Sequence, residues 1–423
     1  MKVFKFGGAS VKDASAVRNV VSIVDRYSDK LGIVVSAMGK TTNAMEQIVQ
    51  RLWKREEKEF LDLVDERYQF HLSIMDELFA SKSNSIYTEI ENEFDELKTK
   101  YHDRIPENFA FEYDQIVSLG EVISTKIVVA YLNEQGKKAK WEDARLIIQT
   151  DRKYREAEVD WKRTEELFAE KFIPSFQNYD VLVTQGFIGH TPEGFTTTLG
   201  REGSDFTAGI MAYCCNAESV TIWKDVPGML NADPKWFDNT IKLDEISFKE
   251  AIELSYYGAS VIHPKTIKPL QNKGIPLYVK SFVDPEADGT VIQSSMGKDH
   301  LVPSFIFKMD QVLFSFTPKD FSFLVEKNLS DIFERLSALD AKINLMQNSA
   351  LNFSVLLDGD KADIPKICAA FDDTYHVKFN EKLELITIRH YDDATIKRVT
   401  VDKEVLLEQK TRETARLIVK QLS

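Results

Sequence analysis

The sequence predicts an α/β protein in which a three-layer α/β/α domain is followed by a smaller ferredoxin-like α+β region. Short continuous apolar segments, such as residues 181–187 and 219–223, alternate with helical segments and end in polar or glycine-containing turns. This pattern is typical of buried strands in a parallel sheet. From about residue 301 the expected order becomes strand, helix, two strands, helix and strand, which is the ferredoxin-like arrangement.

Composition and charge narrow the class of protein. The 423 residues are 43% hydrophobic and 29% charged, enough to bury a large core divided into two or three domains. The 67 acidic side chains outnumber the 54 basic ones and give a net charge of -13. Because such a chain repels a nucleic-acid backbone, we expect no nucleic acid as partner. A small anion needs only a local cationic pocket.

Cysteine usage and the N-terminal residues indicate where the protein works. The three cysteines make neither a disulfide framework nor a metal-ligand spacing, which favours a reducing cytoplasm. Met1 leads directly into a predicted strand rather than into a basic and apolar leader, and we expect no membrane-spanning run of about 18 apolar residues. The sequence therefore predicts a cytoplasmic protein without a membrane partner.

The first domain begins with a strand at residues 3–6, a glycine turn, a helix at 11–27 and a strand at 32–36. This order is a βαβ unit that opens a parallel sheet. Residues 43–110 are charged, with apolar positions at mixed three- and four-residue spacings, which predicts a helical insertion. A helix that opens at Ser118, a hairpin before Thr198 and a helix that runs to Tyr213 follow.

Proline and glycine between residues 284 and 303 interrupt any regular pattern and predict a boundary near residue 300. We therefore expect a first domain at 1–300 and a second at 301–423. The elements predicted in the second are a strand at 312–316, a helix at 329–339, strands at 343–346 and 353–357, a helix at 364–371 and a strand at 377–379. Strand-like runs at 383–388, 395–401 and 415–420 follow without an amphipathic helix, so a second unit of this kind is expected to be truncated.

Lys5, Gly7, Gly8 and Ser10 form the most informative motif, between the first strand and the first helix. Backbone N–H groups of such a turn and a helix N-terminus face an anion, and a lysine neutralises its charge. The motif predicts a phosphate-binding turn, with an ordinary tight turn as the alternative.

Two further motifs carry polar side chains. The loop from Ser36 contains Gly-Lys-Thr but is not a P-loop, because Val34 stands where a Walker A sequence needs glycine. The hydroxyls of Ser36 and Thr42 suit a small polar ligand, or else an ordinary helix cap. Glu121, near the start of an apolar helix, is either a first-turn carboxylate favoured by the helix dipole or an anion that binds an ammonium group.

Arg201, Ser204 and Asp205 lie in a glycine-containing segment just before a helix. A forked guanidinium binds a carboxylate through two hydrogen bonds, while a hydroxyl and an acid at a helix N-terminus suit an anion-binding site. Lys224 and Lys235 follow another strand and suit nucleotide phosphates, with a charged surface turn as the alternative.

Taken together, these motifs resemble the aspartate kinase (aspartokinase) family of the amino-acid kinase superfamily, and the C-terminal module is similar to the ACT regulatory domains that follow there. Four positions depart from the usual family pattern: Ala9 replaces threonine, Glu202 glycine, Leu230 tyrosine and Ser260 lysine. The resemblance rests on six phrases in the family's order, which are residues 5–11, 36–43, 118–125, 200–208, 224–235 and 256–264.

The resemblance implies a role for each motif. Lys5 stabilises the transferred phosphoryl group and Asp205 positions the reactants. The phosphate-binding residues are Gly7, Gly8 and Ser10; the amino-acid site consists of Ser36, Thr42, Glu121, Arg201 and Ser204; the nucleotide site consists of Lys224, Asp225, Leu230, Lys235 and Ser260. The implied cofactors are ATP and Mg²⁺, the metal being carried with ATP.

The expected reaction is the ATP-dependent phosphorylation of the side-chain carboxylate of L-aspartate to 4-phospho-L-aspartate, the first step of the aspartate-family amino-acid pathway. A carboxylate with a pKa of about 3.9 is ionised at pH 7, so no general base is needed. Two alternatives stay open: a kinase of glutamate or carbamate, and a catalytically weak amino-acid sensor, which Glu202, Leu230 and Ser260 motivate.

The C-terminal region predicts assembly and regulation. A ferredoxin-like unit alone leaves a sheet edge uncovered, so we expect it to pair with a second subunit in a homodimer or higher oligomer. The resemblance implies lysine or threonine as an allosteric effector bound at that junction.

Overall fold

The computed structural model spans residues 1–423 and describes all of them except 104, 238, 260–261, 296, 321 and 423. The chain forms two compact units, and neither is continuous in sequence. Unit 1 consists of Met1–Met229, Lys242–Ser255 and Ser260–Asp299, and unit 2 consists of Leu230–Ile241, Tyr256–Ala259 and His300–Ser423.

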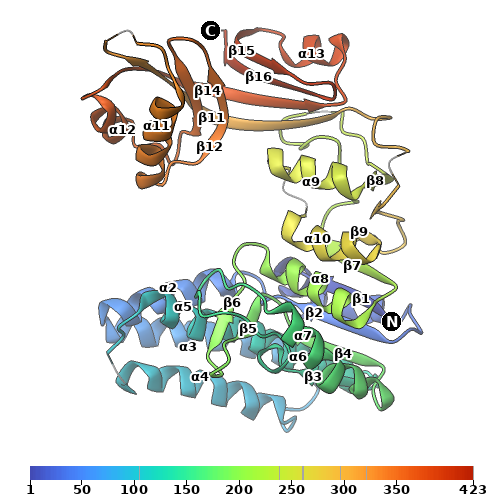
Figure 1. The fold of residues 1–423 in the computed structure, drawn as a ribbon. Helices are drawn as coiled ribbons and strands as arrows, with labels where there is room; N and C mark the ends of the chain where they lie inside the picture. Colours follow the sequence, from blue (N-terminus) through green and yellow to red (C-terminus); the bar gives the residue numbers. More distant parts are fainter. Residues whose placement is uncertain (104, 238, 260–261, 296, 321, 423) are drawn as a thin grey trace. The chain divides into compact units, whose positions relative to one another are not determined.

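Unit 1 is built on an eight-stranded sheet with the order β3-β4-β2-β1-β7-β9-β10-β8 (Figure 1). β1 pairs in parallel with β2 and β7, and β10 runs antiparallel to β9. The predicted α/β class with a parallel central sheet is confirmed. The strands are β1 (Lys2–Phe6), β2 (Leu31–Val35), β3 (Ala139–Glu142), β4 (Val181–Gln185), β7 (Ser219–Lys224), β8 (Glu245–Ser247), β9 (Leu277–Ser281) and β10 (Thr290–Gln293), with the predicted hairpin as β5 (Ile188–His190) and β6 (Thr196–Thr198).

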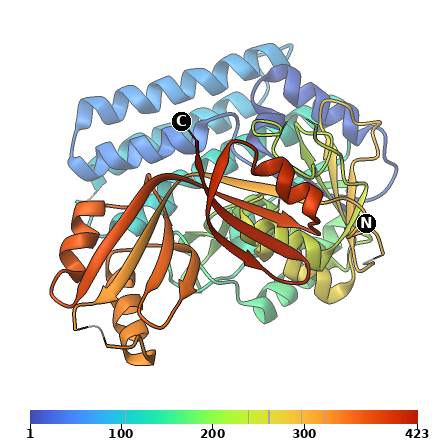
Figure 2. The ribbon, with the colours of Figure 1, turned by 90° about the horizontal axis from the view of Figure 1, so that it is seen from above.

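The predicted helical insertion at residues 43–110 supplies several of the helices of unit 1. The segment 43–110 holds most of α2, all of α3 and α4, and the start of α5; Figure 2 shows the two long helices α3 and α4, in light blue, side by side. The helices are α1 (Ala14–Val24), α2 (Thr41–Lys54), α3 (Glu57–Leu78), α4 (Ile86–Asp103), α5 (Phe109–Val117), α6 (Leu119–Glu134), α7 (Trp161–Leu167), α8 (Gly203–Cys215), α9 (Phe248–Tyr257) and α10 (Pro264–Lys273).

Local backbone chemistry shortens two predicted elements. The first helix begins at Ala14 and not at residue 11, because the Asp13 side chain caps it by accepting the Ala16 N–H at 2.8 Å. Residues Gly8–Val11 form a short 3₁₀ turn instead. The strand predicted to reach residue 187 ends at Gln185, because Phe187 has a φ of 71°, a left-handed conformation that a strand cannot contain.

Two consecutive helices of unit 1 form an unusually apolar stretch. Phe109–Glu134, which covers α5 and α6, is long and apolar enough to cross a membrane by length and composition. However, 83% of its most apolar window is buried inside the protein, as in the core helix of a globular domain.

Unit 2 carries a six-stranded sheet with the order β12-β13-β11-β14-β16-β15, and every described pairing in it is antiparallel. The chain order β11, α11, β12, β13, α12, β14 confirms the ferredoxin-like prediction. The elements are β11 (Ser304–Pro318), α11 (Glu326–Ala338), β12 (Ile343–Asn348), β13 (Phe353–Asp358), α12 (Ile364–Phe371), β14 (Tyr375–Arg389), α13 (Asp393–Val399), β15 (Lys403–Lys410) and β16 (Thr414–Gln421).

Three predictions for the end of the chain were wrong. Residues 377–379 and 383–388 belong to one long strand, β14, and not to two strands. Residues 393–399 form helix α13 rather than a strand, because Asp392 and Thr395 exchange capping hydrogen bonds of 2.7 and 2.8 Å. This segment therefore does contain a helix. Strand β15 was missed because its charged residues, together with the adjacent Val405, Leu406 and Leu407, give no apolar alternation.

Aromatic packing explains why residues 230–241 belong to unit 2. The Phe237 ring stacks on Phe305, with centroids 4.6 Å apart. Both rings lie in an apolar cluster with residues of β14 and β16, including Ile386 and Leu417. The Asn231 carbonyl also accepts a hydrogen bond from the Phe305 N–H at 2.6 Å. The segment that holds Leu230 and Lys235 is thus part of the C-terminal core.

Candidate functional site

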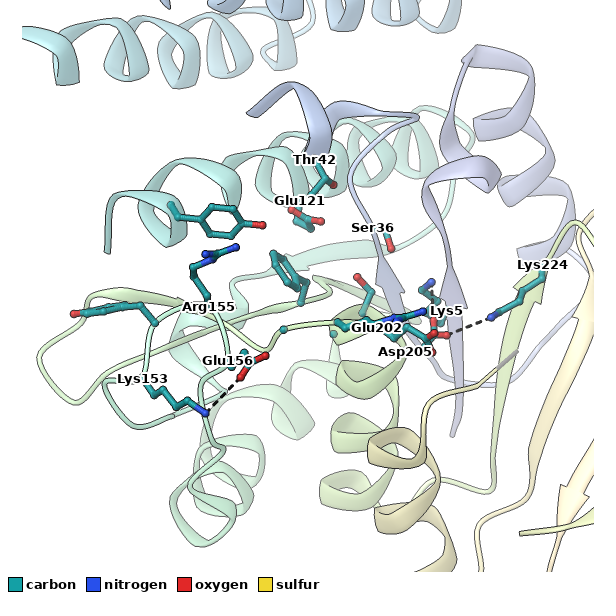
Figure 3. A pocket seen from close by; sticks show the side chains of 17 residues that line it. Lys5, Ser36, Thr42, Glu121, Lys153, Arg155, Glu156, Glu202, Asp205 and Lys224 are labelled. Atoms are coloured by element: carbon teal, nitrogen blue, oxygen red, sulfur yellow. Dashed lines mark hydrogen bonds and ion pairs between the residues drawn. The ribbon is translucent and has the colours of Figure 1, made fainter. Parts of the chain in front are cut away.

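A cavity of about 820 Å³ lies in unit 1 and takes residues from the carboxyl ends of β1, β2 and β7 (Figure 3). Parallel strands bring these ends to one edge of the sheet, where ligands bind in open α/β folds. Eight residues predicted from sequence line the cavity: Lys5, Ser36, Thr42, Glu121, Arg201, Ser204, Asp205 and Lys224.

The remaining predicted residues lie elsewhere. Gly7, Gly8, Ser10 and Asp225 do not line the cavity. Leu230 and Lys235 lie in unit 2, and Ser260 falls outside the described residues.

Gly8 has a structural reason to be glycine. A Cβ atom there would lie 2.8 Å from the Ala37 carbonyl oxygen and 2.9 Å from that of Gly39, both rigid backbone atoms. The Gly8 carbonyl also accepts the Gly39 N–H at 3.1 Å. The turn after β1 is therefore packed directly on the loop after β2, which holds two strand ends of the cavity together.

Three buried or half-buried charges meet at one end of the cavity. Lys5 Nζ lies 2.7 Å from Asp205 Oδ1, and Lys224 Nζ lies 3.6 Å from Asp205 Oδ2. Asp205 is 3% exposed. Burial alone would raise the pKa of its carboxyl, but the ammonium groups of Lys5 and Lys224 outweigh burial and hold the pKa below its usual value. Asp205 is therefore an anion that orients two cations.

Glu121 presents a carboxyl oxygen in need of a partner. It lies in the first turn of α6 and is 3% exposed. Oε1 accepts the Ala37 N–H at 3.3 Å, whereas Oε2 accepts no hydrogen bond from any described residue. Burial raises the pKa of Glu121 to about 8, although the Ala37 N–H and the nearby Lys5 oppose the rise. Such a group is suited to a cationic ligand.

The cap alternative for Ser36 and Thr42 finds no support. The N-cap of α2 is Lys40, and no side chain caps this helix by a hydrogen bond. The Thr41 hydroxyl bonds the Met38 carbonyl at 2.7 Å and is fully buried. In this loop, the half-buried Ser36 and Thr42 line the cavity with their hydroxyl-bearing side chains.

The segment before α8 explains why glycine is usual at position 202 in the resembled family. Gly200 has a φ of 77° and Glu202 a φ of 55°, and only glycine adopts this left-handed region without cost. A Cβ atom at Gly203 would lie 2.7 Å from the Phe187 ring. Glu202 lines the cavity, and its Oε2 is buried without a hydrogen-bond partner in the described part of the chain.

The sequence analysis missed six residues that line the cavity: Tyr113, Lys153, Tyr154, Arg155, Glu156 and Phe187. Most of them lie in the loop 153–156, which the buried Asp114 anchors: its carboxylate accepts the Arg155 N–H, the Thr198 N–H and the Thr198 hydroxyl. Burial raises the pKa of Asp114 to about 6, although these hydrogen bonds lower it in part. An aspartate within an apolar helical stretch was the signal that could have pointed to this anchor.

Within the described part of the chain, no three histidine, cysteine, aspartate or glutamate side chains form a metal-binding group.

Comparison with known proteins identifies the family. Residues 1–281 match the model of the amino acid kinase family. Lysine-sensitive aspartokinase 3 of Escherichia coli is 33% identical over 357 residues, which are 84% of this chain and 78% of that protein. The chain is an aspartokinase of the amino acid kinase family. It also matches the bifunctional aspartokinase/homoserine dehydrogenase 1 of Zea mays at 32% identity, but spans only 32% of that protein.

Solved structures of aspartokinases share the fold. E. coli aspartokinase III in complex with lysine and aspartate has a TM-score of 0.82 at 26% identity, over 99% of this chain and 95% of that one. Its complex with aspartate and ADP has a TM-score of 0.80 at 27% identity, over 99% and 96%. Clostridium acetobutylicum aspartate kinase, at 22% identity and a TM-score of 0.80 over 99% and 96%, supports the fold alone.

The pKa of Glu121 predicts that aspartate binding releases a proton. With a pKa of about 8 the empty site holds a protonated carboxyl at pH 7, and an ammonium group stabilises only the ionised form. We expect release of about one proton at pH 7 and an affinity that rises about tenfold per unit between pH 6 and 7. Calorimetry in buffers of different ionisation enthalpy measures both.

Glu121→Gln should abolish the proton release and weaken aspartate binding at pH 8. Glu193→Gln, which changes an exposed carboxylate paired with Arg152, is the control and should behave as the wild type. Aspartate binding without proton exchange in the wild type would contradict the assignment of Glu121 to the ammonium group.

Proposed function

We propose that this aspartokinase transfers the γ-phosphoryl group of ATP to the side-chain carboxylate of L-aspartate and forms 4-phospho-L-aspartate. The observation that carries the proposal is a single cavity that joins the Lys5–Asp205–Lys224 cluster to Glu121 and Arg201. The complexes of E. coli aspartokinase III with aspartate and ADP, and with lysine and aspartate, support the same ligands.

The amino-acid end of the cavity supplies charges opposite to those of the α-carboxylate and the ammonium group of aspartate. Arg201 is exposed in the cavity, and no described residue pairs with its guanidinium, so we assign it to the α-carboxylate of aspartate. The free oxygen of Glu121 takes the ammonium group. The hydroxyls of Ser36, Thr42 and Ser204 provide further hydrogen bonds that fix the substrate's orientation.

The catalytic end neutralises charge. Lys5 is 8% exposed, and in such a water-poor setting an ammonium group stabilises the transferring phosphoryl group more strongly than in water. Asp205 fixes the position of both Lys5 and Lys224. The aspartate side chain is already ionised, so its oxygen attacks phosphorus without a base, and no proton moves.

The residues assigned to the nucleotide rest on two kinds of support. We assign Lys224 to the phosphates from its place in the cavity; the roles of Gly7, Gly8, Ser10, Asp225, Leu230, Lys235 and Ser260 rest on the resemblance alone. Mg²⁺ would arrive with ATP and offset phosphate charge. The buried Oε2 of Glu202 lacks a partner in the described residues and is a hard oxygen atom of the kind that Mg²⁺ prefers, so Glu202 fits the ion.

Residues 1–300 are assigned to catalysis and 301–423 to regulation, in a cytoplasmic enzyme. The edges of the sheet in unit 2 are β12 and β15, and an uncovered edge supports pairing with a second subunit. Lysine is the favoured effector, because the relative from E. coli is lysine-sensitive and its structure contains lysine; threonine is the second candidate.

The function is tested by ATP consumption with hydroxylamine, which traps an acyl phosphate as a hydroxamate. We expect aspartyl hydroxamate in amounts equal to the ATP consumed, and little product from glutamate or carbamate. Product from glutamate or carbamate alone would establish a different kinase. Binding of aspartate without any turnover would establish a sensor.

Lys5→Ala is the informative variant in this assay. Loss of one preorganised charge should lower kcat by roughly 100- to 1000-fold. Lys30→Ala, on the surface and paired with Asp180, is the control and should keep wild-type turnover. Near wild-type turnover of Lys5→Ala would contradict the role of Lys5.

Regulation is tested on the full chain, with lysine and threonine added singly and together. We expect lysine to inhibit, with a coupling of about 1 to 3 kcal/mol between effector and substrate. Activity that neither amino acid changes, together with absence of binding by calorimetry, would overturn the effector assignment.

A further inference from the structure

Arg155 lines the cavity, and the proposed function gives its positive charge no role. Its guanidinium carbon lies 4.6 Å from the centre of the Tyr113 ring. In the described part of the chain, no carboxylate lies within ion-pair distance of it. Figure 3 shows Arg155 at the end of the cavity where Glu121 and Thr42 are labelled, far from Lys224.

The backbone of Arg155 is held in a costly conformation. Its φ is 72°, in the left-handed region that costs a residue with a side chain about 1 kcal/mol. The N–H of Arg155 lies 3.1 and 3.0 Å from the two carboxylate oxygens of Asp114, which is fully buried. A strained residue that is firmly held at a cavity wall is typical of functional sites.

The Tyr113 ring, on which the Arg155 guanidinium lies, is itself held in place. Its hydroxyl donates a hydrogen bond to Glu46 Oε1 at 2.6 Å, and the side chain is 9% exposed. The guanidinium of Arg155 therefore packs one face on a rigid ring, and its N–H groups are left for a ligand in the cavity. A stacked guanidinium keeps its planar fork ready for a carboxylate.

We propose that Arg155 is a second specificity residue, which binds the α-carboxylate of the amino-acid substrate together with Arg201. The inference rests on the proposed function. The α-carboxylate and the ammonium group of an amino acid share one carbon atom, so a cation on the Glu121 side of the cavity meets the carboxylate when Glu121 holds the ammonium group. Two carboxylate oxygens offer about four acceptor sites, more than one guanidinium fills.

The test compares aspartate with 3-aminopropanoate, which is aspartate without its α-carboxylate. Arg155→Gln should raise the KM for aspartate by about 10- to 100-fold, the loss expected for a charged hydrogen bond, with kcat and the KM for ATP little changed. The inhibition constant of 3-aminopropanoate should change less than about threefold. Arg155→Lys, which keeps the charge without the fork, should lie between wild type and Arg155→Gln.

Arg152→Gln is the matched control, because Arg152 directly precedes the loop 153–156 but pairs with Glu193 on the surface. It should leave every constant unchanged. An unchanged KM for aspartate in Arg155→Gln, or an equal loss for 3-aminopropanoate, would overturn the proposal. Calorimetry of aspartate with the wild type separates the two questions: no aspartate binding there refutes the proposed function, whereas equal binding by wild type and Arg155→Gln refutes only the role of Arg155.

Discussion

The ion cluster of Lys5, Asp205 and Lys224 is the constraint on which the rest of unit 1 depends. Its members come from β1, the first turn of α8 and the end of β7. Removal of Asp205 would leave the buried Lys5 without its carboxylate partner, at a cost of about 3 to 5 kcal/mol. The parallel register of β1 with β7, which pairs Lys5 with Ile222 and Phe6 with Trp223, keeps the two lysines on either side of Asp205.

Much of the fold and of the site could be predicted because the signals are local in sequence. Polar residues at the ends of apolar strands and at the starts of helices predicted a ligand site, and eight of them line one cavity. Arg155 and Tyr113 could not be found this way, because the contacts that place them join α5, the loop 153–156 and β6. Helix α13 was missed because its stability begins with the Asp392–Thr395 cap and not with an apolar stripe.

Three residues with side chains adopt left-handed backbone conformations at the cavity. Arg155, Phe187 and Glu202 all have a positive φ and all line it. Each costs of the order of 1 kcal/mol in folding, and a glycine would remove that cost. Glu202 adds a carboxylate to the cavity wall at a position where the resembled family usually has glycine.

The central claim is that the aspartate carboxylate itself attacks phosphorus, since this carboxylate is already ionised and needs no base, while the lysines of the cavity neutralise charge. The most direct measurement uses aspartate labelled with ¹⁸O in its side-chain carboxylate and follows the product by ³¹P NMR. The account predicts an acyl-phosphate resonance shifted by ¹⁸O in the bridge between carbon and phosphorus. Phosphate without label, formed at the same rate with or without aspartate, would show that water is the acceptor and would contradict the account.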